Sequence, residues 1–234
     1  MDMNDLNFIN YSIFFKERIN ARQILFCKKY KGIGLNDYRE KIASQISIDV
    51  KKIAIPLQVH SNKVKFINHP GFFEDTDGLI TSNQDIILSL QTADCMPIFL
   101  FDKFNGIKGL IHSGWRGTKD KIIENALNIM LENNSDLSNI KIVIGASIHK
   151  CCYEIGLDLV PYFDSSCIYT LDGKKYLSLQ EQIMIDLNDL GILKNNIYID
   201  KSCTFMDSNL SSYRRDGSAA GRMISLLGAF NGDH

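Results

Sequence analysis

Five short, largely apolar runs, each bounded by polar residues or glycine, dominate the hydrophobic pattern of the chain. The runs are Ile53–Leu57, Ile86–Leu90, Met96–Phe101, Ile107–Ile111 and Ile140–Ile144. Continuous apolar runs of this length are typical of strands that are buried on both faces, whereas half-exposed strands alternate apolar and polar residues. The pattern therefore predicts that these five segments form the core of a β-sheet.

Two amphipathic helices are predicted between and after these strands. In Lys119–Asn133 the apolar residues recur at helical spacing, and Thr118 offers a side-chain oxygen that can cap the helix N-terminus. Further along, Ser178 and Glu181 form a capping box ahead of a second apolar periodicity, which Gly191 ends.

A third, short helical stretch is predicted at Ala219–Leu227. Strands mixed with helices, including at least one strand–helix–strand unit, are typical of a mixed α/β (α+β) fold. No repeat, charge block or Pro/Gly/Ser-rich linker divides the sequence. We therefore expect a single domain over residues 1–234.

Composition and charge limit the kinds of molecule that the protein can be expected to bind. The chain has 234 residues, of which 45% are hydrophobic and 23% charged, and its formal net charge is -1. No basic field is present to attract nucleic acid, and no apolar run is long enough to span a membrane. Asp2 and Asp5 stand where a secretory signal needs basic residues, and six cysteines without framework spacing indicate reduced thiols. These features predict a cytoplasmic protein with a small-molecule substrate, without deciding between a monomer and a weak dimer.

Three polar strings interrupt or end the predicted strands, where a sequence that only builds a core has no use for them. They are Gln58–Ser61, Thr92–Pro97 and His112–Thr118. The second string lies between two strongly apolar runs, so Asp94 and Cys95 are expected at a turn or bulge within the sheet. A carboxylate in such a place is costly unless it is paired.

His60, Cys95 and His112 are the metal-binding candidates of these strings. Two imidazoles and one thiolate suit zinc or copper, and three protein ligands leave a fourth position open, as in catalytic zinc sites. The spacing is long-range and has no local signature. In a second interpretation the histidines are satisfied by other partners and Cys95 is a small buried hydrophobe, and composition and spacing alone favour this second interpretation.

The string after His112 also predicts an anion pocket. Gly114 and Gly117 permit a tight turn, and Arg116 stands beside the start of a helix, so a phosphate can be bound there. An alternative is that Arg116 pairs with a nearby carboxylate such as Asp94.

Two further segments are candidates for the same cleft. Near the end of the chain, Arg214, Arg215 and Arg222 form a basic cluster. For two of the three we expect a salt-bridged brace, with Asp216 as one partner, rather than an anion site. Cys151 and Cys152 follow the strand Ile140–Ile144, and their thiols are expected to be buried packing groups rather than ligands.

Taken together, these strings resemble one known family, the YfiH or laccase-domain proteins, also called polyphenol oxidase or multicopper-oxidase-like proteins. The matching strings are Gln58–His60, Asp77–Ile80, Thr92–Pro97, His112–Gly117, Cys152–Gly156 and Ser212–Gly217. They occur in the expected order over about two-thirds of the chain. The sequence departs from the common family pattern at Gly145–Ala146 and His149, just before the Cys-Cys-Tyr-Glu stretch.

The resemblance implies a layered αββα sandwich and a metal, zinc or else copper, held by His60, Cys95 and His112. It further implies a purine nucleoside phosphorylase acting on adenosine, inosine and methylthioadenosine with phosphate as co-substrate, together with some deamination of adenosine. Cys95, Asp94 and Arg116 are then the catalytic candidates, with Arg116 placed to hold phosphate and Asp94 to orient a neighbour or accept a proton.

Three other functions remain open from the sequence. Cys95 with His60 or His112 can form a metal-free cysteine hydrolase dyad. A copper-dependent phenol oxidase is an alternative, although the five histidines of the chain are too few for a multicopper centre. The three ligands can also simply hold the fold together in a protein without enzymatic activity.

Overall fold

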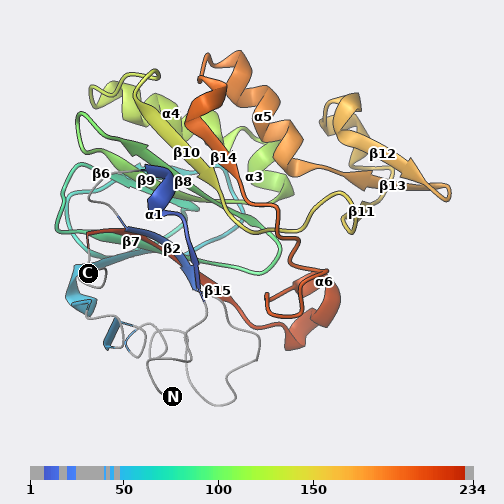
Figure 1. Ribbon diagram of the computed structural model, residues 1–234, viewed down its shortest axis with the longest axis horizontal. Coiled ribbons are helices and arrows are strands. Elements are labelled where there is room, and N and C mark those ends of the chain that lie inside the picture. Colours follow the sequence, from blue (N-terminus) through green and yellow to red (C-terminus); the bar gives the residue numbers. More distant parts are fainter. Residues whose placement is uncertain (1–7, 16–19, 25–39, 41–42, 45–47, 230–234) are drawn as a thin grey trace.

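The protein is described by a computed structural model that covers residues 8–15, 20–24, 40, 43–44 and 48–229 (Figure 1). Within these residues the fold is built on two sheets of six strands each. The first sheet has the strand order β1 (Phe8–Asn10), β2 (Asn20–Ile24), β15 (Met223–Gly228), β7 (Ile87–Thr92), β3 (Ile53–Pro56) and β5 (Gly71–Phe73). The second has the order β14 (Ile197–Ile199), β10 (Ile140–Ile144), β8 (Met96–Asp102), β9 (Lys108–Ser113), β6 (Gly78–Thr81) and β4 (Val64–Phe66).

Helices and a small sheet complete the described part of the chain. The α-helices are α1 (Ser12–Phe15), α3 (Trp115–Lys119), α4 (Ile122–Glu132), α5 (Leu179–Asp189) and α6 (Tyr213–Asp216). The small sheet has the order β11 (Glu154–Ile155), β13 (Lys174–Leu177) and β12 (Ile168–Leu171). Single 3-10 turns lie at Val50–Lys52, Val160–Tyr162, Ser165–Cys167, Lys194–Asn196 and Gly217–Ala219. None of the helices in the described residues is long and apolar enough to cross a membrane.

Strand β8 contributes side chains to two hydrophobic cores, one on each face of the second sheet. Ile98 and Leu100 pack toward α4 and α5, while Phe99 and Phe101 pack against residues of the first sheet. All of β8 is buried, because the second sheet is covered by helices on one face and by the first sheet on the other (Figure 1). This two-sided burial explains why the run lacks alternation. The mixed α/β fold class is confirmed, and three layers of the expected αββα sandwich, one helical and two β, lie within the described residues.

The predicted helix Lys119–Asn133 is observed as α4 (Ile122–Glu132), and Lys119 instead ends the short preceding helix α3. The break falls at Lys121, which has left-handed backbone geometry (φ 62°) and is the N-cap residue of α4. Thr118 is therefore not the N-cap that the sequence indicated. It lies inside α3, fully buried, and its hydroxyl is hydrogen-bonded to that of Ser113 at 2.9 Å.

The predicted helical stretch Ala219–Leu227 is wrong. Its second half is β15, which lies between β2 and β7 in the first sheet and is buried along its whole length. A short apolar segment such as Met223–Leu227 is compatible with a buried helix or a buried strand by pattern alone. The segment forms a strand because it pairs with β2 on one side and with β7 on the other.

A buried lysine in β9 leads to a prediction about stability. Lys108 is fully buried, and its Nζ donates to the carbonyl of Asn83 at 2.8 Å. Burial lowers the pKa of Lys108 from 10.5 to about 8, with only partial opposition from Asp85. We expect Lys108→Met to raise the free energy of unfolding at pH 7 by about 2 kcal/mol, because the variant no longer buries a charge.

The pH dependence of the free energy of unfolding tests whether the buried charge of Lys108 is the cause. Between about 8 and 10.5 the unfolded chain keeps the proton that folded Lys108 has lost, so the wild type gains stability as the pH rises through this window. Denaturant titrations at pH 7 and pH 10.5 should show the difference between variant and wild type shrinking. The exposed Lys103→Met is the matched control, and a difference that does not change with pH would contradict the assignment.

Candidate metal and nucleoside site

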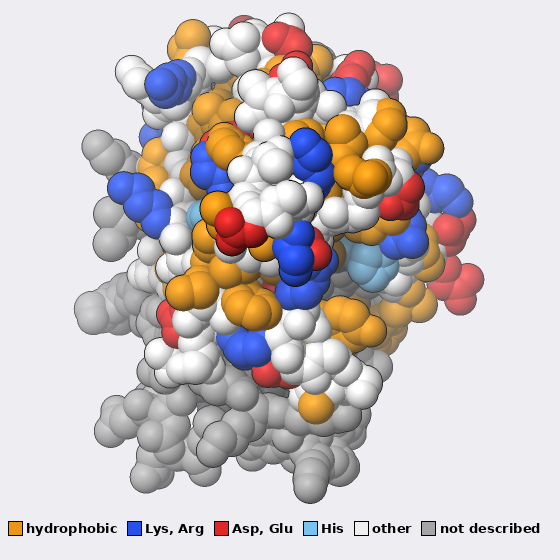
Figure 2. Space-filling view, turned by 90° about the vertical axis from the view of Figure 1, so that its right-hand side faces the viewer, with side chains coloured by type: hydrophobic (Ala, Val, Ile, Leu, Met, Phe, Trp, Pro, Cys, Tyr) orange, Lys and Arg blue, Asp and Glu red, His pale blue; other side chains and the backbone are white. Residues whose placement is uncertain are grey.

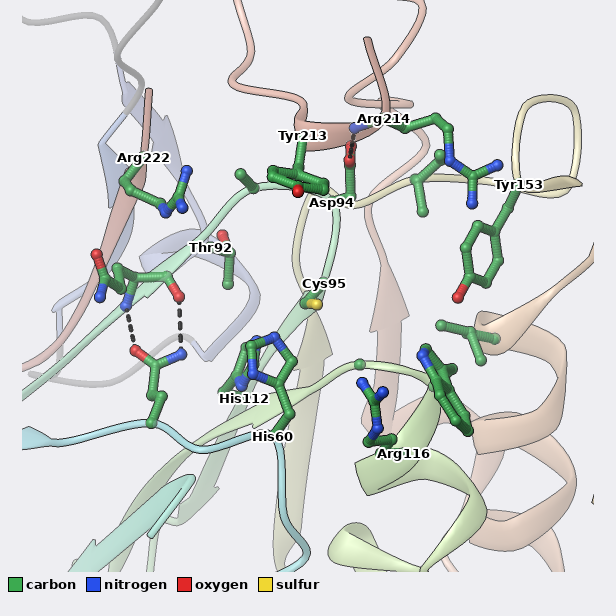
Figure 3. Close-up of a pocket in the computed structure, with 17 residues that line it drawn as sticks. His60, Thr92, Asp94, Cys95, His112, Arg116, Tyr153, Tyr213, Arg214 and Arg222 are labelled. Atoms are coloured by element: carbon green, nitrogen blue, oxygen red, sulfur yellow. Dashed lines mark hydrogen bonds between the residues drawn. The ribbon is translucent and has the colours of Figure 1, made fainter. Parts of the chain in front are cut away.

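A pocket of about 460 Å³ lies at the ends of β7, β8 and β9 (Figure 3). Its lining comes from six parts of the chain: the segment after β3, the turn between β7 and β8, the segment from β9 into α3, the loop after β10, the start of α5, and residues 213–222. A cavity of this size is in the range that holds small-molecule ligands.

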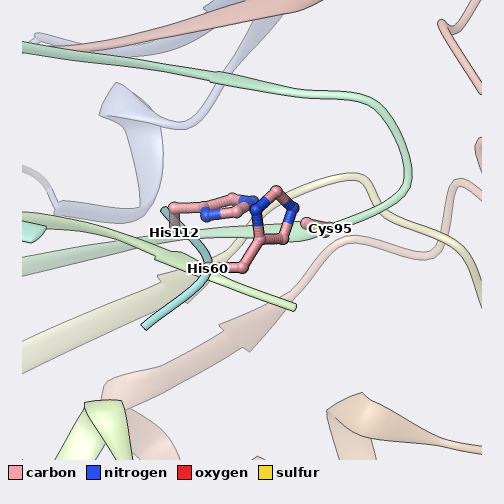
Figure 4. A group of neighbouring side chains, drawn as sticks. All are labelled: His60, Cys95 and His112. Carbon is pink, nitrogen blue, oxygen red and sulfur yellow. The ribbon is translucent and has the colours of Figure 1, made fainter. Parts of the chain in front are cut away.

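His60, Cys95 and His112 meet at the floor of this pocket, as the sequence predicted. Their ligand atoms all lie within 4.8 Å of one another (Figure 4). The two imidazole rings stand edge to face, with centroids 4.8 Å apart. Pairing of β8 with β9 places Pro97 opposite His112, which brings the turn that carries Cys95 beside it.

Backbone geometry is unusual at the site. His60 has a positive φ of 60°, a conformation that residues other than glycine rarely adopt. Gly114 is required for a different reason, since a Cβ at this position would lie only 2.9 Å from the Cys95 sulfur. Strained backbone and close approach at one place are typical of functional sites.

Asp77 organises two of the three candidate ligands. The Nδ1 of His112 donates to its carboxylate at 2.8 Å, which leaves the Nε2 of that ring free to bind a metal. The same carboxylate accepts the backbone N–H groups of Val59 (3.2 Å), His60 (3.0 Å) and Ser61 (2.6 Å). Although burial raises the pKa of Asp77, hydrogen bonds from His112 and Ser61 outweigh it and lower the pKa from 3.8 to about 2. No role was predicted for Asp77 from the sequence, although its position directly before the buried strand β6 was an available signal.

Cys95 and His112 are electrostatically coupled. Burial raises the pKa of the Cys95 thiol, but the neighbouring His112 and His60 lower it from 9.0 to about 6. Conversely, burial lowers the pKa of His112, but Cys95 and Asp77 raise it from 6.5 to about 9. The pocket therefore stabilises a thiolate, which is the form that binds metal and the form that acts as a nucleophile. The Cys95 thiolate and the imidazoles of His60 and His112 are close enough together to bind one zinc-type ion.

Comparison with known proteins identifies the family. The sequence profile described as multi-copper polyphenol oxidoreductase laccase matches residues 34–229 of the chain. The chain belongs to this laccase family. A purine nucleoside phosphorylase of Clostridium acetobutylicum is 33% identical over 187 residues, which cover 76% of this chain and 78% of that protein.

Two further relatives of this laccase-family chain extend the comparison. An adenosine deaminase of an unknown prokaryotic organism is 28% identical over 226 residues, covering 84% of this chain and 86% of that protein. The crystal structure of YlmD from Geobacillus stearothermophilus superimposes with a TM-score of 0.83 at 23% identity, covering 91% of this chain and 92% of that chain. The last likeness establishes the fold, in agreement with the resemblance that the sequence motifs indicated.

Asp94 is paired in this laccase-family site, although not with Arg116. Its carboxylate accepts the hydroxyl of Thr204 at 2.6 Å and the backbone N–H of Arg214 at 2.6 Å. Arg116 instead stacks over the ring of Trp115, with its guanidinium carbon 4.3 Å from the ring centroid. Within the described residues it forms no ion pair with Asp94, so the cation remains available to the pocket.

The basic cluster near the end of the chain divides between two roles. Arg215 is the expected brace: it pairs with Asp216 at 2.9 Å and donates to several backbone carbonyls. The expectation that a second arginine braces the fold in an ion pair is not met among the described residues. Arg214 and Arg222 line the pocket, and Figure 3 places Arg222 and Arg116 on opposite sides of Cys95.

The loop after β10 contributes Tyr153 to the pocket. The centroid of its ring lies 5.1 Å from the guanidinium carbon of Arg214. The expectation that Cys151 and Cys152 are buried packing groups is wrong, since Cys151 is exposed and Cys152 partly exposed. The loop turns back on itself at His149, whose carbonyl accepts the N–H groups of both Cys152 and Tyr153 at 2.9 Å. This turn places the aromatic ring in the pocket and the two thiols outside its lining.

Proposed function

We propose that this protein is a zinc-dependent purine nucleoside phosphorylase, acting on adenosine, inosine and methylthioadenosine, with a secondary adenosine deaminase activity. The observation that carries the proposal is the composition of one pocket, in which the metal-binding group adjoins aromatic rings and arginine side chains. Relatives named purine nucleoside phosphorylase and adenosine deaminase support the choice of substrate.

The metal is proposed to bind His60, Cys95 and His112. Bound there, zinc would supply Lewis-acid polarisation of a substrate oxygen or water. Asp77 fixes the tautomer of His112 and, through the backbone N–H groups of residues 59–61, the position of His60. These contacts are of the kind that orient metal ligands and increase their basicity.

The co-substrate phosphate is proposed to bind beside Arg116 and Arg214. Both guanidinium groups lie on the Tyr153 side of the pocket (Figure 3). Arginine binds phosphate oxygens through charge-assisted hydrogen bonds. Figure 2 shows basic and acidic side chains interspersed over one face of the molecule, so a convergence of arginines in a pocket is a local feature rather than part of a broad basic surface.

Asp94 is proposed as a positioning residue. Its two carboxylate oxygens are already engaged by Thr204 and by the backbone of Arg214, so it ties the turn of Cys95 to the segment that carries the second arginine. Its backbone is also in the left-handed region, with φ 85°.

Arg116→Ala should raise the KM for phosphate by about tenfold or more, because the variant loses a charge-assisted contact to the anion. Steady-state kinetics of adenine release at varied phosphate would measure this. Lys119→Ala, which removes a cation one turn further along α3, is the control and should leave the KM unchanged. An unchanged phosphate KM in Arg116→Ala would place the anion elsewhere.

Product chromatography tests the activity itself. Zinc-loaded protein is incubated with adenosine, with and without phosphate, beside a His112→Ala variant. Adenine and ribose 1-phosphate that form only with phosphate, and vanish in the variant, are the expected result; inosine formed without phosphate would report the deaminase activity. If zinc-loaded protein forms neither adenine nor inosine, the proposed function fails.

A second candidate function rests on the thiolate that His112 and His60 stabilise at Cys95. A thiolate beside an imidazolium is the arrangement of a cysteine hydrolase, which needs no metal. In that case the enzyme would keep full activity in a strong chelator and would be inactivated by alkylation of Cys95.

A further inference from the structure

Three cysteines outside the pocket lining form a second cluster of thiols. The sulfur of Cys151 lies 3.3 Å from that of Cys152 and 3.7 Å from that of Cys203, and all three sulfurs lie within 4.8 Å of one another. The cluster forms because β10 and β14 are parallel neighbours, so the segments that follow them leave the sheet at the same edge (Figure 1). The first two cysteines are in the segment after β10, and the third is in the segment after β14.

We propose that Cys151, Cys152 and Cys203 bind a second cation of the zinc class. A tetrahedral zinc ion with Zn–S bonds of about 2.3 Å holds its sulfur atoms about 3.8 Å apart. The Cys151–Cys203 separation of 3.7 Å matches this, and the Cys151–Cys152 separation of 3.3 Å is shorter. Thiolates select soft or borderline ions such as zinc over magnesium or calcium. Three protein ligands leave the fourth position to solvent, on the side where Cys151 is exposed.

The surroundings of Cys203 favour a thiolate. Its sulfur accepts the backbone N–H of His149 at 3.4 Å. Burial raises the pKa of this thiol, but backbone N–H groups of His149, Met206 and Phe205 outweigh it and lower the pKa. Backbone donors around a sulfur stabilise negative charge as they do around any anion.

The other two thiols need a cation to ionise. Burial raises the pKa of both thiols, and for Cys152 burial together with the neighbouring sulfurs raises the pKa to about 12. Three thiolates at these separations would repel one another unless a cation lay between them. A metal ion supplies that charge and displaces the protons. A disulfide between two of the cysteines would leave the third thiol without a role.

The cluster is placed to support the pocket. Ser147 and Cys203 form a parallel bridge, and the N–H of Thr204 donates to Ser147 at 3.0 Å. One linked segment carries Tyr153 into the pocket, and the other carries Thr204, whose hydroxyl holds Asp94. A cation bound by both segments would fix their relative position.

Metal stoichiometry tests the proposal on the full-length chain, purified in reductant and loaded with zinc. Native mass spectrometry should find two zinc ions in the wild type, one in Cys95→Ser and one in Cys151→Ser. Cys151 is exposed, so its replacement leaves no cavity, and a thermal melt checks that the variant is folded. Cys167→Ala, which removes a buried thiol elsewhere, should keep both ions.

Cobalt gives an independent readout. In a Cys95→Ser background, sulfur-to-cobalt charge-transfer absorption should persist, and adding Cys151→Ser or Cys203→Ser should weaken cobalt binding by more than about tenfold. One zinc ion in the wild type, two in Cys151→Ser, or a disulfide within the cluster in reductant would each overturn the second site. None of these results bears on adenosine turnover, so the proposal and the proposed function fail separately.

Discussion

Replacing Cys95 with serine should lower adenosine phosphorolysis by about a thousandfold or more, corresponding to the loss of several kcal/mol of stabilisation by a catalytic metal. The reason is that, in the proposed zinc site, Cys95 would be the single anionic ligand and the two histidines would bind as neutral imidazoles. Serine keeps the size of the side chain but ionises far less readily than a thiol, so the site loses most of its affinity for zinc. Adenine release at saturating substrate, with zinc content measured on the same sample, checks both effects.

Chelation separates the two roles that Cys95 can play. If it is a ligand, a strong chelator should inactivate the wild type, and added zinc should restore activity. If it is a nucleophile, activity should survive the chelator and disappear only in Cys95→Ser. Cys167→Ala controls for the loss of a thiol, and full activity in metal-free wild type would refute the zinc-dependent proposal.

Asp77→Asn should weaken zinc binding by about 10- to 100-fold and lower the free energy of unfolding by about 2–4 kcal/mol. Asp77 is fully buried, and its carboxylate accepts three backbone N–H groups and the His112 ring. An amide has only one acceptor oxygen, and its NH₂ group would face donors, so at least one buried N–H loses its partner. Competition with a chromophoric chelator and denaturant titration measure the two quantities.

Asp75→Asn is the matched control, because Asp75 is exposed and pairs with Lys63 at the surface, where such pairs contribute about 0–1 kcal/mol. The pH dependence adds a check. Folding lowers the pKa of Asp77 from 3.8 to about 2, so its stabilising contribution is complete above pH 3.8 and is lost as the pH falls through about 2. A stability difference between wild type and Asp77→Asn that persists unchanged at pH 2 would argue against the carboxylate as its source.

The sheet core was predictable from sequence because its strands are buried on both faces. Runs such as Met96–Phe101 lack exposed polar positions. The structure places the five runs at β3, β7, β8, β9 and β10, divided between two sheets rather than in one. The same property made Met223–Leu227 ambiguous, because a short, largely apolar segment with one serine has no clear helical or strand period. Only its two strand partners, β2 and β7, define it, and pairing between segments so distant along the chain leaves no local trace.

The candidate site was predictable to the extent that its residues interrupt strands. His60, Cys95 and His112 were found in this way and do lie together in the structure, and the family resemblance favours metal ligands over ordinary residues. Asp77 was missed as an organiser because its role depends on backbone N–H groups of residues 59–61, which meet it only in the folded chain. The thiol cluster was missed because Cys203 is distant in sequence from the other two cysteines.

The three proposed zinc ligands lie on three different segments, at positions 60, 95 and 112, and none shares a helix or hairpin turn with another. Pairing of β8 with β9 is enough to bring Cys95 beside His112, but His60 follows β3 in the other sheet, so all three meet only after both sheets have assembled. In the unfolded chain, bringing all three ligands together requires two loop closures, whose entropic cost is not offset by strand pairing. Zinc should therefore load a chain that has already folded, and its on-rate should report the accessibility of the finished pocket rather than the speed of chain collapse.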